Sequence, residues 1–440
     1  MQGSRELARL LGELEEQLVT CMRCGLCQSV CPLYAQTGRE ADVARGKLAL
    51  LDGLAKEMVE DAGAVQERLN RCLLCGSCAA NCPSGVKALD IFLKARALLA
   101  GYQGLSPAKK LIFRGLLARP ALFNLLFSLA PKLQGILGKP ASELLGTSCA
   151  RFASPLGDRH FRRLAKEPLH ALVPQMDSPP QPGRPRVAFF VGCLIDKVYP
   201  QVGQAVIQVL EHHGVGLAIP PAQACCGMPA LAAGDTQAFQ QMLRHNLARL
   251  RPETFDHLVT ACATCTSAIK KLWPLMSQGL EAAEKAQVEA ISQKVIDISQ
   301  FLVDKQLLGD ANHPAGGEAG RLTYHDPCHL KKSLGVAAQP RQVLAATPGR
   351  QLVEMAEADW CCGMGGSFNL LHYEQSAAIG QRKLQNILAS GCQTVTTSCP
   401  ACMLQLSDAL SRAGQEVAVK HVIQVYAEGL GHAGKGGKGS

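Results

Sequence analysis

The chain has 440 residues, of which 47% are hydrophobic and 18% charged, a composition typical of a folded globular protein with several domains. Its net charge of +9 comes without a basic stripe interleaved with aromatic residues, which argues against a nucleic-acid partner. Twenty cysteines are many for this length, and they indicate either disulfides or metal ligands.

The N-terminal residues favour metal ligands. Residues 1–20 carry four acidic groups and no continuous apolar stretch, so they do not resemble a secretory signal peptide. We therefore expect a cytoplasmic protein. In a reducing compartment, a high cysteine count indicates a metalloprotein more often than a disulfide framework.

Residues 1–100 are predicted to form an all-helical domain. Apolar residues recur at helical spacing over 6–19, 44–59, 64–70 and 86–100. Two cysteine motifs lie between these segments, so both motifs are expected to be loops that connect helices.

The two motifs have the same spacing. The first is Cys21-x-x-Cys24-x-x-Cys27-x-x-x-Cys31-Pro32, and the second is Cys72-x-x-Cys75-x-x-Cys78-x-x-x-Cys82-Pro83. This is the ligand pattern of proteins with two [4Fe-4S] clusters, in which each motif supplies three thiolates to one cubane and the fourth to the other. Zinc favours paired C-x-x-C units without a following proline, so zinc knuckles and buried free thiols are the weaker alternatives.

We therefore assign four thiols to each of two cubane clusters. The first set is Cys21, Cys24, Cys27 and Cys82, and the second is Cys72, Cys75, Cys78 and Cys31. Because each motif contributes to both clusters, the clusters are expected to be close neighbours and to form a short one-electron path.

Residues 101–183 are predicted to be a helical connector that ends in a proline-rich linker over 174–185. Charged residues and prolines interrupt its most apolar part, 111–137, whereas a membrane span needs about 20 uninterrupted apolar residues. We expect this part to form core helices or a docking surface for a partner subunit. An interfacial membrane contact is the alternative.

The C-terminal half is an internal duplication. Each copy has one cysteine after an apolar strand, then a Cys-Cys-Gly-Met sequence, then a closing C-x-x-C pair, and matching cysteines are offset by 135 to 137 residues. So constant a period indicates two domains of one fold. The first copy contains Cys193, Cys225, Cys226, Cys262 and Cys265, and the second contains Cys328, Cys361, Cys362, Cys399 and Cys402.

Both copies alternate apolar strands with helical stretches, which predicts α/β domains over 184–310 and 311–430. A linker rich in glycine and alanine over 311–320 is expected between them. The glycine- and lysine-rich residues 431–440 are expected to be a disordered tail.

Five thiols in each copy exceed what one zinc ion or one cubane requires. Adjacent cysteines can bridge metals in an enlarged cluster, and Gly227 and Gly363 would let the backbone approach it closely. We expect metal binding in at least one copy. Structural buried thiols and a redox-active dithiol are the alternatives.

Other residues near these motifs carry weaker signals. His325 and His329 flank Cys328, and we expect them to satisfy local backbone groups rather than to support a metal site or relay protons. Cys149 and Cys392 match no motif and are expected to be inert.

With these motifs the chain resembles the iron–sulfur subunits of the glycolate/D-lactate oxidase (dehydrogenase) family, whose tandem cysteine-rich (CCG) domains also occur in heterodisulfide reductase-related proteins. The resemblance covers nearly the whole length. It implies an α+α/β fold, with an all-helical two-cluster ferredoxin domain followed by two tandem α/β CCG domains. It also implies that the five cysteines of each CCG domain hold a noncubane [4Fe-4S] cluster, so that one or two such clusters accompany the two cubanes.

The resemblance further implies an electron-transfer function. A partner flavoprotein with FAD would oxidise a 2-hydroxy acid, glycolate or D-lactate, and this chain would pass the electrons to a quinone or another acceptor. The chain shows no flavin or nicotinamide motif of its own, since the glycines at 363–366 do not fit G-x-G-x-x-G.

Two other functions compete with this one. The first is a heterodisulfide reductase-like catalytic subunit that reduces a disulfide at a noncubane cluster, and the second is a zinc-binding scaffold without redox activity. We expect a cytoplasmic location, with a peripheral contact at the inner face of the cell membrane as an extension.

Overall fold

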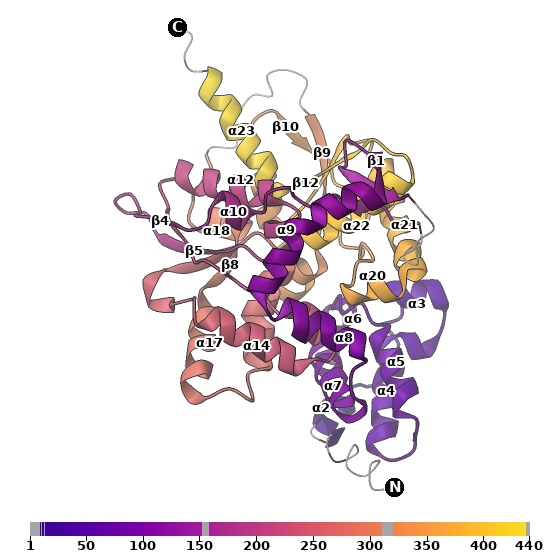
Figure 1. The fold of residues 1–440 in the computed structure, drawn as a ribbon. Coiled ribbons are helices and arrows are strands. Elements are labelled where there is room, and N and C mark those ends of the chain that lie inside the picture. The colour runs from indigo at the N-terminus through magenta and orange to yellow at the C-terminus, as the bar shows by residue number, and fades with distance from the viewer. Residues whose placement is uncertain (1–8, 10, 13, 152–157, 310–319, 437–440) are drawn as a thin grey trace. The chain divides into compact units, whose positions relative to one another are not determined.

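The computed structural model describes residues 9–436 except Leu10, Glu13, 152–157 and 310–319 (Figure 1). The chain forms two compact units. The first contains residues 1–118, 227–241 and 361–381, and the second contains 119–226, 242–360 and 382–440.

The described part of the first unit is helical, as the sequence predicts. Helices α4, α5 and α7 pack through Leu51, Leu69, Ile91 and Leu99, all fully buried. The elements are α2 (Glu15–Val19), α3 (Pro32–Thr37), η1 (Glu40–Asp42), α4 (Ala44–Ala55), α5 (Ala62–Asn70), α6 (Ser77–Ala80), α7 (Ala88–Gln103), α8 (Pro107–Lys110), η2 (Leu111–Leu117), α13 (Met228–Ala232) and α20 (Ser367–Leu371). Helices α14 (Thr236–Leu247) and α21 (Tyr373–Ala389) begin in this unit and end in the second.

Local sequence signals explain where these helices begin and end. The Asp61 carboxylate accepts a hydrogen bond from the Ala64 amide at 2.9 Å and so caps the first turn of α5. Gly104 adopts a left-handed φ of 81° and ends α7, three residues beyond the predicted end. The structure thus confirms helices on both sides of each cysteine motif.

The second unit contains two sheets with the same strand order. In the first sheet, β5 (Arg186–Phe190), β6 (Gly216–Ile219), β7 (His257–Thr260) and β8 (Val295–Asp297) are parallel in the order β6-β5-β7-β8. In the second, β9 (Gly320–His325), β10 (Arg350–Leu352), β11 (Thr394–Thr397) and β12 (Ala418–His421) are parallel in the order β10-β9-β11-β12. The equivalent order confirms the predicted duplication of α/β domains.

The helices of the second unit connect and flank these strands. They are α9 (Pro120–Leu137), α10 (Leu169–Leu172), α11 (Cys193–Lys197), α12 (Pro200–His212), η3 (Pro252–Thr254), α15 (Ala263–Ser267), η4 (Ala268–Leu272), α16 (Trp273–Leu275), α17 (Ala282–Lys294), α18 (Ile298–Asp304), η5 (His329–Ser333), α19 (Ala338–Ala345), α22 (Pro400–Arg412) and α23 (Val422–Gly436). The central strands β5, β7, β9 and β11 are buried over most of their length, as expected for parallel sheets that are covered on both faces.

The region between the cysteine motifs and the first sheet differs from its prediction as a helical connector. After α9, the strands β1 (Gly138–Ser142), β2 (Thr147–Ala150) and β3 (Phe161–Arg162) form a small antiparallel sheet. Gly138 and Pro140 end the helical pattern there, and Gly146 with a φ of 54° makes the turn into β2.

Two predicted irregular segments are also partly ordered. Within the predicted linker 174–185, β4 (Met176–Ser178) adds an antiparallel edge strand to β6. At the C-terminus, α23 extends to Gly436, because its hydrogen-bonded turns propagate into the residues predicted as tail. The linker predicted over 311–320 lies outside the described residues except for Gly320, which begins β9.

Among the described residues, no single helix is both long and apolar enough to cross a membrane. The segments Pro107–Leu117 and Pro120–Leu137 meet that test of length and composition only when they are taken together. The prediction of core helices for 111–137 is wrong for α9, because none of its residues is buried. Its leucines lie on the surface instead.

Candidate functional site

The two N-terminal motifs share a pair of left-handed residues around their second cysteine. Arg23 and Gly25 have left-handed φ values of 58° and 84°, and Leu74 and Gly76 at the equivalent positions have 55° and 74°. Arginine and leucine rarely adopt this region, which costs free energy. A left-handed residue on either side of the second cysteine tightens each loop, so that its thiols turn toward one centre.

The loops bring together the two crossed sets of thiols that the sequence predicts. Cys21, Cys24, Cys27 and Cys82 line one cavity, which Cys78 also reaches, while Cys31, Cys72, Cys75 and Cys78 line another. Each cavity therefore takes three thiols from one motif and the last cysteine of the other.

The final cysteine of the first motif is held by the helix that follows it. Cys31 is the N-cap of α3, and its sulfur accepts a hydrogen bond from the Tyr34 amide at 3.5 Å, while Pro32 occupies the first turn. Burial raises the pKa of Cys31 to about 12. Burial likewise raises the pKa of Cys78 well above its usual value, and the neighbouring thiols raise it further.

This donor set fits a cubane cluster. No described cysteine forms a disulfide, and each cavity is lined by three cysteines of one motif together with the last cysteine of the other. Thiolates that lie close together repel one another, and burial adds to the cost of the charged form at Cys31 and Cys78. Iron would remove the repulsion, and soft thiolates are the ligands that iron–sulfur clusters prefer.

In the second unit, the cysteines of the first CCG copy gather beyond the carboxyl ends of parallel strands. Cys193 begins α11 after β5, the adjacent pair Cys225 and Cys226 follows β6, and Cys262 caps α15 after β7. The carboxyl ends of the strands in an open α/β sheet are its usual binding edge.

The five thiols of this copy lie in two contacting groups, one of two and one of three. The sulfurs of Cys193 and Cys225 are 3.7 Å apart, and Cys265 contacts the thiols of both Cys226 and Cys262. Contact with Cys225, together with burial, raises the pKa of Cys193 well above its usual value. The structure thus brings the five predicted residues into a pair and a group of three after neighbouring strands, and their softness suits a metal cluster.

Several residues that position this site were not identified from the sequence. Asn246 accepts a hydrogen bond from the Ala224 amide at 2.9 Å and donates to the Cys225 carbonyl at 3.1 Å. The Trp273 indole donates to the Cys226 carbonyl at 2.9 Å. These contacts hold the backbone of both cysteines of the adjacent pair. In the sequence, the only signal for such a role is that Asn246 and Trp273 each lie among apolar residues of a helix.

Gly192 leaves no space for a side chain beside the site. Its φ is 73°, and a Cβ atom there would lie 3.0 Å from the Cys265 sulfur. The chain therefore approaches the sulfur more closely than any other residue type would allow.

The second CCG copy is divided between the two units. Cys328, Cys399 and Cys402 belong to the second unit, where Cys399 caps α22 after β11. Cys361 and Cys362 belong to the first unit, where the Gly363 amide donates to the Cys361 sulfur at 3.5 Å. The second unit by itself therefore supplies three of the five predicted thiols.

The closing C-x-x-C pairs of the two copies meet inside the second unit. The Ala263 amide donates to the Ser398 carbonyl at 3.1 Å, and the thiol of Cys262 contacts that of Cys399. The thiols of Cys262 and Cys402 donate hydrogen bonds to Cys399 and hold its pKa well below the usual value. The duplicated domains thus share a thiol-rich boundary that the sequence did not predict.

The two histidines that flank Cys328 differ from each other. The His329 Nδ1 atom lies 3.1 Å from the hydroxyl of Thr264. His325 is fully buried, and neither ring nitrogen makes a hydrogen bond of ordinary geometry with a described residue. Burial lowers its pKa to about 3, so the ring is neutral. The Ala358 carbonyl does interact with the His325 ring, in keeping with the expectation of a local backbone partner.

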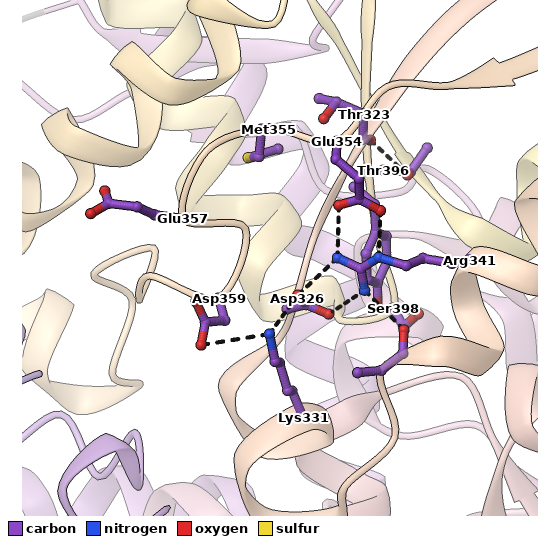
Figure 2. Close-up of polar contacts among 12 residues, drawn as sticks. Thr323, Asp326, Lys331, Arg341, Glu354, Met355, Glu357, Asp359, Thr396 and Ser398 are labelled. Carbon is purple, nitrogen blue, oxygen red and sulfur yellow. Dashed lines mark hydrogen bonds and ion pairs between the residues drawn. The ribbon is translucent and has the colours of Figure 1, made fainter. Parts of the chain in front are cut away.

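Asp326, between His325 and Cys328 in sequence, is the centre of an ionic network (Figure 2). Its buried carboxylate accepts two hydrogen bonds from Arg341, at 2.8 and 3.0 Å, and lies 3.3 Å from the Lys331 ammonium. Figure 2 shows the guanidinium of Arg341 between Asp326 and Glu354, which it contacts at 2.5 and 3.0 Å. Burial disfavours the charge of Arg341, but these two carboxylates outweigh it and raise its pKa.

We expect the replacement Arg341→Met to destabilise the second CCG domain. It leaves the Asp326 carboxylate buried with only Lys331 as a cationic partner, and removal of one member of a buried pair costs about 3 kcal/mol. Urea unfolding of the anaerobic protein should show a lower midpoint. Arg163→Met, which breaks the exposed pair with Glu143, should leave the midpoint nearly unchanged, and equal effects would contradict the assigned role.

Comparisons with known proteins agree with this arrangement. Residues 17–86 match the 4Fe-4S dicluster domain, and residues 187–270 and 322–407 each match the cysteine-rich CCG domain. The chain is 28% identical over 98% of its length to the probable glycolate oxidase iron-sulfur subunit of Bacillus subtilis, and it covers 99% of that protein.

Two further relatives share parts of the chain. A lactate utilization protein A from an Exiguobacterium species is 30% identical over 57% of this chain and 100% of its own length. A dihydromethanophenazine:CoB–CoM heterodisulfide reductase subunit from Methanosarcina barkeri is 26% identical over 94% of both chains. The chain therefore belongs to the family of glycolate/D-lactate oxidase iron–sulfur subunits, whose tandem CCG domains are shared with heterodisulfide reductase-related proteins.

Proposed function

We propose that this chain is the electron-transfer subunit of a flavin-dependent glycolate or D-lactate dehydrogenase. In this proposal FAD is held by a partner subunit, which oxidises the 2-hydroxy acid, and this chain delivers the electrons to a quinone or another acceptor. The observation that carries it is the pair of crossed thiol sets in a chain that is similar over nearly its full length to a glycolate oxidase iron-sulfur subunit.

The ligands of two cubane clusters are proposed to be the eight thiols of the first unit. Bound [4Fe-4S] clusters accept and release single electrons, which suits a flavin that collects two electrons from its substrate. The chain's own residues hold the clusters and limit water around them. Leu48, Val86 and Ala88 line the first cavity, and Leu73 and Phe92 line the second.

The five cysteines of each CCG domain are proposed to hold one noncubane cluster. In the first copy, the contacts of Cys193 with Cys225 and of Cys265 with Cys226 and Cys262 support this proposal. In the second copy, both ring nitrogens of His325 are buried without a hydrogen bond of ordinary geometry. This is consistent with a site in which a bound cluster lies beside the ring. The cytoplasmic location and a peripheral contact with the inner face of the cell membrane also belong to the proposal.

The function is tested by partner capture followed by reduction with substrate. The tagged chain, purified anaerobically with its complex, should bring down an FAD-containing protein, and glycolate or D-lactate should then bleach the iron–sulfur absorbance. Succinate, which has no 2-hydroxyl group, serves as the control and should leave the absorbance unchanged. If no flavoprotein associates and no 2-hydroxy acid reduces the clusters, the proposal is wrong.

The crossed ligand sets predict a selective effect of Cys82→Ser. This change should remove the cluster of Cys21, Cys24 and Cys27, because a serine hydroxyl is a poor ligand for iron in a cubane. Electron paramagnetic resonance of the reduced protein should lose one of two cubane signals. Cys149→Ser, outside both motifs, should retain both signals. Two intact signals in Cys82→Ser would disprove the crossed sets.

A second candidate function is the reduction of a disulfide at a noncubane cluster. It is favoured by the similarity to a heterodisulfide reductase subunit and by the meeting of the two C-x-x-C pairs at Cys262 and Cys399. It predicts that the chain alone, given a low-potential electron donor, releases thiols from a disulfide. Absence of thiol release from protein with all clusters assembled would exclude it.

A further inference from the structure

Helix α9 presents an unusually apolar face to its surroundings. None of its 18 residues is buried. The exposed aliphatic side chains lie between 39% and 65% exposed and comprise Leu122, Leu125, Leu126, Leu129, Leu133, Ile136 and Leu137. A continuous aliphatic face of this length on a folded domain indicates a surface that contacts a protein partner or a membrane.

Two polar side chains of α9, Asn124 and Gln134, turn toward the rest of the second unit, whereas Ser128 and Lys132 are exposed. Asn124 accepts a hydrogen bond from the Lys197 ammonium at 2.6 Å, and Gln134 accepts one from the Leu164 amide at 2.8 Å. The Ser128 hydroxyl donates to the Leu125 carbonyl of its own helix at 2.7 Å. A helix at a water-facing surface has the opposite arrangement, with its apolar stripe toward the core.

The charged side chains of the segment that carries this face are all cationic. The sequence contains no carboxylate between Asp90 and Glu143. Arg119, Lys132 and Lys139 are exposed, and within the part of the chain that the structure describes they form no ion pair. A cationic rim around an aliphatic face is complementary to a surface that is anionic outside and apolar inside.

We propose that α9 lies in the headgroup region of an anionic phospholipid bilayer. An α-helix of 18 residues is about 27 Å long, so it would lie along the membrane surface with its leucines among the upper acyl chains and its cations at the phosphates. A protein partner suits the face less well, because protein interfaces are enriched in aromatic residues and Leu is uncommon at their hot spots. The two aromatic side chains of α9, Phe123 and Phe127, are both half-buried rather than exposed.

This proposal deepens the peripheral membrane contact of the proposed function, but it does not depend on the substrate. The test uses the full-length, cluster-loaded chain and flotation with vesicles of phosphatidylcholine and phosphatidylglycerol. The chain should float with anionic vesicles, and Leu125→Gln combined with Leu129→Gln should weaken the partition at least tenfold. Lys132→Glu combined with Lys139→Glu should weaken binding to anionic vesicles and remove its dependence on salt.

A matched control replaces two leucines exposed elsewhere in the second unit. Leu172→Gln with Leu388→Gln should leave flotation unchanged. Equal flotation of the α9 variant and the unaltered chain would overturn the proposal. So would loss of flavoprotein capture by the α9 variant with vesicle binding intact, since the face would then serve a protein. Iron–sulfur absorbance and far-ultraviolet circular dichroism verify that each variant is folded.

A second inference, carried by separate observations, concerns two buried cations beside the second thiol cavity. Lys47 is 1% exposed, lines the cavity of Cys31, Cys72, Cys75 and Cys78, and donates to the Asp42 carbonyl. Arg96 is 2% exposed and donates to the carbonyls of Cys72 and Ala232, each at 2.7 Å.

The other charges around the second cavity leave a net positive environment. The buried Asp42 carboxylate lines it too, with Arg68 at 3.6 Å. One carboxylate thus faces three cations. At the first cavity, Arg45 pairs with Glu40 at 2.6 Å, and both side chains are at least 30% exposed. That cation is neutralised by its partner and screened by water.

We infer that Lys47 and Arg96 make the cluster of the second cavity the more easily reduced of the two cubanes. Reduction adds one negative charge, which a buried cation stabilises more strongly than an exposed ion pair does. This inference rests on the proposed ligand sets. It gives the short electron path a downhill direction, toward the cluster of Cys31, Cys72, Cys75 and Cys78.

Redox titration monitored by electron paramagnetic resonance tests this asymmetry. Lys47→Met should decrease the reduction constant of one cubane at least tenfold, about 59 mV for one electron, and leave the other unchanged. Lys56→Met, an exposed lysine at the end of α4, should change neither. Two assembled cubanes with unaltered potentials in Lys47→Met would refute the inference. Failure to assemble any cubane in the unaltered chain would instead refute the ligand assignment.

Discussion

The first unit depends on one constraint: in each of two sites, sulfurs that repel one another as thiolates must converge on one cavity. Residues in the left-handed region at Arg23, Gly25, Leu74 and Gly76 make the necessary turns. Arginine and leucine adopt this conformation at a cost, so packing around the loops has to hold it. Helices α4, α5 and α7 supply that packing through fully buried leucine and isoleucine side chains.

The second unit meets a related constraint with a different backbone. Parallel strands end at a common edge, and the loops after β5, β6 and β7 carry Cys193, Cys225 and Cys262 to it. The same strand order recurs in the second sheet, so the duplication repeats the edge as well as the fold. Because Cys262 and Cys399 are in contact, a change at one closing pair alters the electrostatic environment of the other.

Much of this arrangement could be predicted from spacing alone. Cysteines at fixed intervals define which sulfurs share a loop, and the near-constant offset between copies defines two domains of one fold. The signals are strong because they depend on local sequence. The positions of Cys82 in the cavity of the first motif and of Cys31 in the cavity of the second were predictable for the same reason. A loop of this length supplies only three sulfurs to one centre.

Features that depend on contacts between distant residues were not predictable. Strand β1 contains Gly138 and Pro140, which are typical of a loop, and β1 to β3 become a sheet only by pairing with one another. Asn246 donates a hydrogen bond to Cys225, which lies 21 residues away in the sequence. Arg96 donates one to Ala232, which lies 136 residues away. The leucines of α9 recur with the spacing of a core helix. This spacing alone does not show whether they face the interior of the protein or its surroundings. Asn124 and Gln134 decide it, because these half-buried side chains bond to the second unit itself. Their partners are Lys197 at the end of α11, Ser148 in β2 and the amide of Leu164.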